Sequence, residues 1–416
     1  MRIPPRSTLG LAASATAASL LLAACGGGGD DNAPIDAPAT RGTMAVSMVS
    51  DAPACGLEAV NLTVTKLRFR QDFNTDPNAG GWTDLSFSPA KRINLLHAAT
   101  ALSGAAIDLG EVSLPTGAYT QMAVVLDSAA GANTVRVSGA TSDVPLEVAA
   151  KVASGFRVPI DLRVDTGGKA SVLVDFNACE SLQMRGATYV LKPRPRLAPA
   201  VLNGVTGFVD KAILASGVVI TAHKGGTILA TTVPHQGTGE FVLPRLGADS
   251  YDVVLQANGR ATGVIGAVPV AATGLTGVAT AASPLRLATS AASSISGQVS
   301  YVAPAVAPED GTWIMASQSI TAVPASAIPA TTVTNRMQAV DLASGNYTLN
   351  NLARGSITWA PYSASATPNF VAVATSGGNG RYRIEALATG FINKTGTSAN
   401  INVSSGNQTG VNITMP

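Results

Sequence analysis

The sequence predicts an all-β protein of three tandem β-sandwich domains, preceded by a short N-terminal segment that lies outside the fold. From Thr43 onward, apolar and polar residues alternate in short runs, and this period of two is typical of β-strands. The chain has 42 glycines and 24 prolines, which are enough to end many short strands. Residues 203–416 contain a diverged internal repeat, which indicates duplicated domains.

The composition excludes several classes of protein. A chain of 416 residues is long enough for two to four domains at roughly 100–200 residues each. Its 46% hydrophobic content excludes a wholly disordered chain. Charged residues make up 12%, and Lys+Arg exceed Asp+Glu by 27 − 25 = 2. Because Arg2 and Arg6 lie in a segment that we expect to be removed, the mature chain has no net charge, and we expect no nucleic-acid partner.

Residues 1–24 have the parts of a bacterial export signal. Arg2 and Arg6 give a positive start, and an uncharged run follows from Leu9 to Leu22. This run is too short for a transmembrane helix, which needs roughly 20 apolar residues. The segment ends in Leu22-Ala23-Ala24-Cys25, which resembles the lipobox of bacterial lipoproteins. The resemblance implies that Cys25 becomes the N-terminus and carries a diacylglycerol; the alternative is an ordinary secretory signal with an incidental cysteine.

Residues 25–41 form a tether rich in Gly, Asp, Pro and Ala, without an apolar period, which is typical of a flexible coil. Gly26 follows the cysteine, at a place where lipoproteins retained in the inner membrane usually carry Asp. The resemblance therefore implies an outer-membrane lipoprotein that faces the periplasm or the cell surface. Since no later apolar stretch has spanning length, the lipid on Cys25 is the membrane anchor that we expect.

Residues 42–200 are expected to form the first β-sandwich. One short helix is expected at Ile93–Leu102, and Pro193, Pro195 and Pro199 mark the boundary with the next domain. The strand-like runs of this segment are residues 43–48, 60–69, 123–126, 135–137, 158–164, 171–176 and 189–191.

A series of short motifs in this segment points to a family. In chain order they are Ser50-Asp51-Ala52-Pro53, Val60-Asn61-Leu62-Thr63-Val64, Gly80-Gly81-Trp82, Ile93-Asn94-Leu95-Leu96, Leu114-Pro115-Thr116-Gly117-Ala118-Tyr119, Leu173-Val174-Asp175-Phe176 and Tyr189-Val190-Leu191-Lys192-Pro193. Their order and spacing resemble the bacterial lipoprotein family known as domain of unknown function 4382. The family has no established activity, so the resemblance implies an exported β-sandwich and no particular chemistry.

The same resemblance implies a disulfide between Cys55 and Cys179, because members of the family often carry cysteines at these two places. If Cys25 is lipidated, these are the remaining thiols of a chain with three cysteines. Export places them in an oxidising compartment, where paired cysteines persist. The alternative is two buried free thiols.

The repeat divides the rest of the chain into expected domains at residues 201–290 and 291–416. Gly207 matches Gly297, an offset of 297 − 207 = 90 residues. Later, Gly239–Leu246 matches Gly345–Leu352, an offset of 345 − 239 = 106 residues. The second unit therefore has about 16 extra residues, which we expect within Val302–Val333.

The repeated pattern resembles the carboxypeptidase-regulatory-like, transthyretin-like sandwich. It consists of a Gly-x-Val start, a Gly-x-aromatic-x-Leu-x-x-Leu strand, and then Gly and a β run, which in the first unit is Tyr251–Leu255. In the second unit, Arg354-Gly355-Ser356-Ile357 stands where Gly-x-Tyr is expected.

Few residues are available for catalysis or metal binding. His97, His223 and His235 lie far apart in sequence, and two histidines of one hairpin without a third ligand make a poor zinc site, so we expect polar histidines near solvent. The sequence has no Gly-x-Ser-x-Gly, His-Glu-x-x-His or phosphate-loop motif. We therefore expect no catalytic residue, no metal and no cofactor.

Two pairs of acids keep other possibilities open. Asp161 and Asp165 lie four residues apart on an expected strand, so they share a face on which Ca²⁺ would find oxygen ligands. Asp175 lies near Glu180 in sequence. A hydrolase would need two buried carboxylates that converge in a cleft.

Trp82, Trp313 and Trp359 are the candidates for stacking on a sugar ring, and packing within the fold is the alternative for each. The leading hypothesis is a non-enzymatic cell-envelope lipoprotein that acts as a binding, adhesive or structural module, with a polysaccharide or a protein as its ligand. The alternatives are a carbohydrate-binding surface lipoprotein and an envelope hydrolase.

Overall fold

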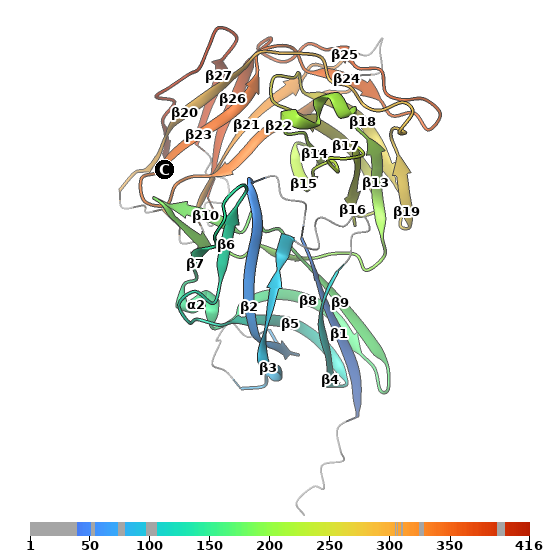
Figure 1. The fold of residues 1–416 in the computed structure, drawn as a ribbon, viewed down its shortest axis with the longest axis vertical. Coiled ribbons are helices and arrows are strands. Elements are labelled where there is room, and N and C mark those ends of the chain that lie inside the picture. Colours follow the sequence, from blue (N-terminus) through green and yellow to red (C-terminus); the bar gives the residue numbers. More distant parts are fainter. Residues whose placement is uncertain are drawn as a thin grey trace, which may run out of the picture. The chain divides into compact units, whose positions relative to one another are not determined.

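The computed structural model describes residues 40–50, 55–73, 80–96, 106–303, 305, 307–308, 311–323, 328–388 and 396–416. In this part of the chain the secondary structure is almost entirely β, which confirms the predicted fold class (Figure 1). A four-residue helix, α2 (Ala150–Ala153), and a 3₁₀ helix, η1 (Lys211–Ser216), interrupt the strands. The helix expected at Ile93–Leu102 starts later than predicted, because Ile93 and Asn94 end a strand; residues 97–102 lie outside the described residues.

The first domain consists of two sheets. Its strands are β1 (Arg41–Val49), β2 (Leu57–Arg70), β3 (Thr83–Asn94), β4 (Ile107–Pro115), β5 (Gly117–Leu126), β6 (Thr134–Val137), β7 (Val144–Glu147), β8 (Phe156–Val164), β9 (Lys169–Phe176), β10 (Leu182–Arg185), β11 (Thr188–Leu191) and β12 (Pro195–Leu197). One sheet has the order β12-β9-β1-β4; the other has the order β10-β11-β7-β6-β2-β5-β8, with β3 also paired to β2.

The core of this domain follows from the alternating sequence. Met44, Val46 and Met48 of β1 are fully buried, and so are Leu62 and Val64 of β2. These residues belong to one apolar cluster, which receives side chains from both sheets. Since every second residue of a strand points to the same face, the predicted period of two is the reason why the two sheets bury these residues against each other.

The two repeats have the same arrangement of strands. The first contains β13 (Asn203–Phe208), β14 (Val219–Lys224), β15 (Thr227–Thr232), β16 (Glu240–Pro244), β17 (Asp249–Gln256), β18 (Gly263–Val270) and β19 (Gly274–Gly277). The second contains β20 (Ala292–Tyr301), β21 (Thr312–Ile320), β22 (Thr331–Ala339), β23 (Asn346–Ala353), β24 (Thr358–Pro361), β25 (Val371–Ala372), β26 (Arg381–Ala388), β27 (Gly396–Asn402) and β28 (Ile413–Met415). The sheet β16-β13-β19 corresponds to β23-β20-β28, and β15-β14-β17-β18 corresponds to β22-β21-β26-β27.

The registers of the two repeats agree residue by residue. Gly207 lies opposite Phe241 in the first repeat, and Gly297 lies opposite Tyr347 in the second. The match between the repeats that the sequence predicts therefore holds in the structure. The hairpin β21–β22 has strands of nine residues, against six in β14–β15, and the interval between its strands, residues 321–330, lies within Val302–Val333, where the extra residues were expected.

The tyrosine that is missing at Arg354–Ile357 lies later in the second repeat. In the first repeat, the Tyr251 hydroxyl donates a hydrogen bond to the Gly247 carbonyl over 2.7 Å. In the second, the Tyr382 hydroxyl donates to the carbonyl of Ala353, which occupies the place of Gly247, over 2.8 Å. Tyr382 is therefore the counterpart of Tyr251, and the insertion between Ala353 and Tyr382 separates it from its acceptor.

The insertion between Ala353 and Tyr382 connects the two repeats. Its strand β24 pairs in parallel with β18, so that β24 and β25 extend the sheet of the first repeat to the order β15-β14-β17-β18-β24-β25. Trp359 of β24 is 3% exposed and lies against Gly266 of β18, where a Cβ atom would come within 1.8 Å of the indole. A separate apolar cluster mixes Val254 and Val264 of the first repeat with residues of the second. The domain boundary between residues 290 and 291 stays a prediction, but the repeats share a sheet across it.

Candidate functional site

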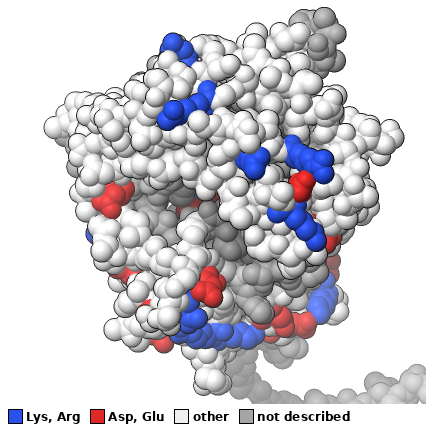
Figure 2. Space-filling model, turned by 45° about the horizontal axis from the view of Figure 1, so that its top comes forward, with Lys and Arg blue, Asp and Glu red and all other residues white. Residues whose placement is uncertain are grey.

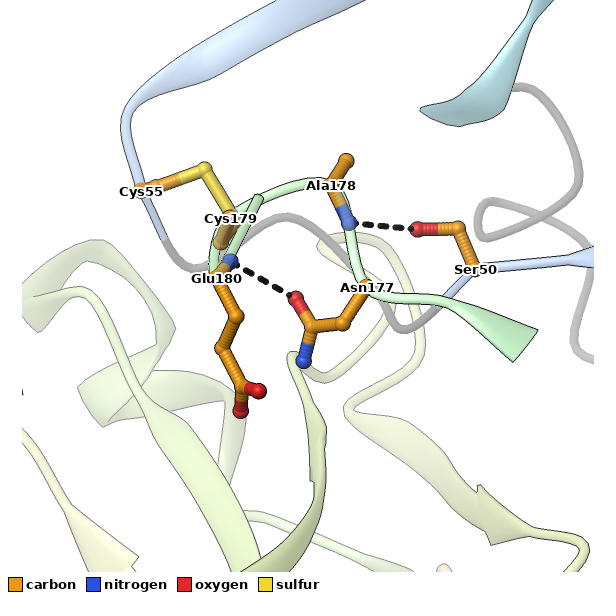
Figure 3. Close-up of a disulfide and its surroundings, with 6 residues drawn as sticks. All are labelled: Ser50, Cys55, Asn177, Ala178, Cys179 and Glu180. Carbon is orange, nitrogen blue, oxygen red and sulfur yellow. Dashed lines mark hydrogen bonds between the residues drawn. A yellow bond between two sulfur atoms is a disulfide. The ribbon is translucent and has the colours of Figure 1, made fainter. Parts of the chain in front are cut away.

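The disulfide corner joins the start of the first domain to its end. Cys55, just before β2, is bonded to Cys179, just after β9, with the two Cα atoms 5.6 Å apart. Figure 3 shows the turn that carries Cys179: the Ala178 amide donates to the Ser50 hydroxyl over 3.2 Å, and the Glu180 amide donates to the Asn177 side chain over 3.1 Å. The pairing agrees with what the family resemblance implied, and the alternative of two free thiols is excluded.

A cavity of about 640 Å³ lies beside the disulfide, with both cysteines in its wall. The first domain contributes the segment Asn177–Met184, the first repeat contributes residues of β14 and β15, and the second repeat contributes residues of β21, β22 and β23. Its volume falls in the range of roughly 300–1,000 Å³ that small-molecule sites have. All three domains therefore contribute residues to this cavity.

Two charged side chains, Glu180 and Arg336, lie in the described wall of the cavity. Burial raises the pKa of Glu180, which Asp175 also raises, and the guanidinium groups of Arg196 and Arg194 oppose this. Burial lowers the pKa of Arg336.

Arg336 is held in place by backbone acceptors. Its Nε atom donates to the Asn350 carbonyl over 3.1 Å, and its Nη1 atom donates to the Asn335 carbonyl over 3.0 Å. Nη1 also donates to the side-chain oxygen of Gln256, from the first repeat. The guanidinium therefore connects the two repeats at the wall of the cavity, and its position is fixed by the fold.

The acids considered for hydrolysis do not form a catalytic pair in the described structure. Asp175 accepts a hydrogen bond from Arg196 Nε over 2.6 Å; burial raises the pKa of Asp175, and Arg196 opposes the shift. Asp175 does not line the cavity, so Glu180 is the single carboxylate in the described wall. Glycosidases use two carboxylates that flank the substrate, and this geometry offers one.

The acids considered for Ca²⁺ lie on the surface. Asp161 is an exposed residue of β8, and Asp165 lies just after that strand and forms an exposed ion pair with Arg163 over 2.9 Å. Among the described residues, no group of three His, Cys, Asp or Glu side chains is placed to hold a metal ion.

The histidines differ from the expectation in one respect. His223 is 1% exposed, so the prediction of a polar side chain near solvent is wrong for it. It lies on β14 on the face that the second repeat covers, its Nε2 atom is 2.7 Å from the Thr221 hydroxyl, and burial lowers its pKa to about 4. His235 is exposed and accepts a hydrogen bond from the Thr238 amide, as expected, and His97 lies outside the described residues.

The three tryptophans occupy three different environments. Trp82 precedes β3, with the guanidinium groups of Arg68 and Arg70 at 5.1 and 5.7 Å from its ring. Trp359 is buried between the repeats. Trp313 lines the cavity and carries the guanidinium of Arg194 at 4.9 Å from its ring. Trp313 is therefore the tryptophan that the structure places at a candidate binding site.

The sequence-based reasoning missed most residues of this site. Gln256, Arg336 and the pair Asn350-Asn351 line the cavity, yet they lie far apart in sequence and match no binding motif. Cys25, the export signal and nearly all of the tether lie outside the described residues. In the part of the chain that is described, no helix has the length and apolar character needed to cross a membrane. On the face shown in Figure 2, charged residues occur in small scattered groups.

Comparison with solved structures gives distant similarities. The chain is similar to the Bacillus anthracis TIE protein (10% identity, 91% of this chain and 51% of that chain, TM-score 0.13), so it spans about half the length of that protein. It is also similar to the Corynebacterium diphtheriae major pilin SpaA (11% identity, 89% and 99% coverage, TM-score 0.17). A third similarity is to two B repeat units of the Staphylococcus aureus collagen binding protein CNA (9% identity, 90% and 98% coverage, TM-score 0.18). TM-scores this low do not establish a shared fold or function.

The sequence comparisons concern the first domain. No curated protein matches the chain. Residues 41–193, which contain the disulfide and the first-domain wall of the cavity, match the family model described as "Domain of unknown function (DUF4382)", and this confirms the family resemblance of that segment.

Proposed function

We propose that this chain is a non-enzymatic cell-envelope lipoprotein that acts as a binding, adhesive or structural module. The observation that carries the proposal is the Cys55–Cys179 disulfide, which closes the first domain. Disulfides persist in exported proteins and are rare in the cytosol, so this bond supports the export signal that the sequence predicts. The connected β-sandwiches suit a protein that must keep a surface intact outside the cytoplasm.

The anchor in this proposal is a lipid on Cys25, and Gly26 directs the protein to the outer membrane. The experiment is expression of Cys25→Ala in a two-membrane bacterium, followed by membrane fractionation. We expect the variant to leave the membrane fraction and its signal segment to remain uncleaved. If it stays membrane-bound with unchanged processing, the anchor is wrong. A matched variant, Gly26→Asp, is expected to keep its lipid and to move to the inner membrane.

A non-enzymatic role is supported by the cavity itself. Its described wall contains one carboxylate, Glu180, and the neighbouring Asp175 is engaged by Arg196. The orientation of the domains, toward the periplasm or the cell surface, is tested by protease treatment of intact cells. Cleavage of the chain by protease added outside would place the domains on the surface.

A second candidate function is carbohydrate recognition, and the position of Trp313 in the cavity favours it. The resemblance of the two repeats to carboxypeptidase-regulatory-like sandwiches remains a prediction and is not needed for this candidate. An envelope hydrolase lacks a comparable observation.

A further inference from the structure

We propose that the cavity beside the disulfide binds a short, neutral saccharide. The inference rests on the carbohydrate-recognition candidate above and names its site and ligand class. It is carried by three observations: two buried donor groups, one from each repeat, the amide-rich wall, and the charged groups of that wall.

The first donor is the side-chain amide of Gln256. This residue is 8% exposed and lines the cavity. Its oxygen accepts a hydrogen bond from Arg336, and because a guanidinium can only donate, the Gln256 amide must turn its oxygen to Arg336 and its nitrogen away from it. The nitrogen, Nε2, has no hydrogen-bond partner among the described residues. The fold thus holds a donor at the cavity wall in a defined orientation.

The second donor is the indole N–H of Trp313. The residue is 7% exposed, lines the same cavity and has no hydrogen-bond partner for Nε1 among the described residues. Arg194 lies over its ring and fixes the plane of the indole. A buried donor without an acceptor costs free energy, and an acceptor delivered by a ligand would remove this cost. Both nitrogens are fully buried, so a ligand with oxygen acceptors would satisfy them once these side chains turn toward the cavity.

The rest of the wall indicates that these acceptors belong to hydroxyl groups. Carboxamides are frequent in it, and each offers both a donor and an acceptor, as a hydroxyl does. Besides Gln256, the wall includes Asn258, Gln338, Asn350 and Asn351, together with Asn177 and Asn335, whose carboxamides already bond within the protein. Apolar residues such as Val219 and Ile228 complete the wall and would pack against the C–H groups of a sugar ring.

The charge of the described wall favours a neutral ligand. Its lining residues include one acid, Glu180, and one base, Arg336, and the guanidinium of Arg336 is already engaged by Gln256 and by backbone carbonyls. An anionic saccharide would have to approach Glu180 without an unengaged cation beside it. A peptide would also bring acceptors, and the edge strands β15 and β22 line the cavity, so uncharged peptides are compared with the sugars in the test.

The test is a binding measurement on the full mature chain in detergent, by isothermal titration calorimetry, with neutral disaccharides and trisaccharides of glucose, mannose, galactose and N-acetylglucosamine. We expect at least one of these sugars to bind. Gln256→Glu keeps an oxygen for Arg336 but replaces the donor, and Trp313→Phe keeps a ring under Arg194 but removes the N–H. Each variant is expected to weaken binding by about tenfold or more.

Two matched substitutions control for charge and for loss of an indole. Gln298→Glu changes an exposed glutamine outside the cavity, and Trp82→Phe changes a tryptophan of the first domain outside it, whose indole nitrogen also has no partner among the described residues. Both are expected to bind the sugar as the parent does, and circular dichroism establishes that all four variants are folded.

Three results would overturn the proposal. If no neutral sugar of the panel binds, the ligand class is wrong. If a sugar binds but Gln256→Glu and Trp313→Phe bind it as tightly as the controls, the sugar lies elsewhere. If a mixture of uncharged tripeptides binds in place of the sugars, and the same two variants abolish this binding, the cavity is a peptide site. None of these results affects the membrane release of Cys25→Ala, so the proposed envelope role is tested independently of the sugar site.

Discussion

The first domain and the pair of repeats hold distant parts of the chain together by different means. In the first domain, a covalent bond joins Cys55 to Cys179, which are 124 positions apart. Residues 203–416 contain no cysteine, and there the tie is non-covalent: strand β24 of the second repeat pairs with β18 of the first, and Trp359 packs against Gly266.

The difference shows where a duplicated sandwich acquires new contacts. The positions that match between the repeats keep their register, and the segment that joins them is the insertion between Ala353 and Tyr382. A repeat can therefore keep the hydrogen bonds of its own core while the inserted strand covers the neighbouring sheet. The disulfide and the contact between the repeats can be tested separately, because the first is broken by reduction and the second by loss of apolar packing.

The largest effect is expected from removal of the covalent tie. Replacing both Cys55 and Cys179 by Ser should destabilise the first domain by up to about 5 kcal/mol, because closure of so long a loop removes much entropy from the unfolded chain. Urea unfolding of the full chain, followed by protease digestion and peptide mapping, would show the first domain opening first. Reducing agent should reproduce the effect in the parent and have none in the variant. Equal protection of the first domain in both proteins would contradict the prediction.

The non-covalent tie is tested by Trp359→Ala. Because this side chain is 3% exposed and fills the space over Gly266, its loss should cost about 3–5 kcal/mol in the free energy of unfolding of the repeats. The measurement is urea unfolding followed by near-ultraviolet circular dichroism. Trp82→Ala serves as the control, since Trp82 is partly exposed and should cost less. A larger effect of Trp82→Ala would contradict the assigned role of Trp359.

The repeats should also differ in their response to acid. His223 lies opposite Asp252, the residue after Tyr251; at the corresponding place in the second repeat, Ser317 lies opposite Arg383. The folded-state pKa of His223 is about 4, below its ordinary value of 6.5. As the pH falls from 6.5 to 4, the unfolded state binds a proton that the folded state does not, so stability that is present above pH 6.5 is lost, by roughly 3 kcal/mol.

Urea unfolding at about pH 7 and about pH 4.5 checks this expectation. His223→Ser should remove most of the loss, because it places in the first repeat the residue type that the second already has. His235→Ser changes an exposed histidine and should leave the acid response as it is. If His223→Ser shows the same acid loss as the parent, the buried histidine is not its cause.

The local parts of the fold could be predicted from the sequence, and the contacts between repeats could not. The alternation in β1 and β2 and the match of Gly207 to Gly297 depend on residues close in the chain or on similarity between segments, and both were predicted. The tyrosine expected near Arg354–Ile357 was missing there, because an insertion moves its counterpart to Tyr382. Parallel pairing of β24 with β18 joins residues almost 100 positions apart and leaves no periodic signal.

In the candidate site, too, one part could be predicted from the sequence and the other could not. The disulfide was implied by a family resemblance, whereas the cavity depends on the meeting of three domains. Gln256 and Arg336 are 80 positions apart, and nothing in either local sequence indicates that their side chains meet. His223 was misjudged for a related reason: its own repeat leaves that face of β14 open, and burial comes from the second repeat, whose Thr334 hydroxyl donates to the Gly226 carbonyl at the end of the same hairpin.

The smallest effects are expected at a tyrosine hydrogen bond that all three domains share. Tyr119, Tyr251 and Tyr382 each donate a hydrogen bond from the hydroxyl to a backbone carbonyl, over 2.9, 2.7 and 2.8 Å. Burial raises the pKa of each of these hydroxyl groups, so they remain protonated donors at neutral pH.

Replacement of any one of these tyrosines by Phe should cost about 1 kcal/mol, the usual net value of such a bond. Because Tyr382 is the most buried, at 1% exposed, its carbonyl partner has the least access to water, and Tyr382→Phe should cost the most. Tyr362→Phe, at a half-buried tyrosine outside this pattern, is the control. Urea unfolding of the four variants checks this order, and a Tyr382→Phe variant as stable as Tyr362→Phe would contradict the shared role of the hydrogen bond.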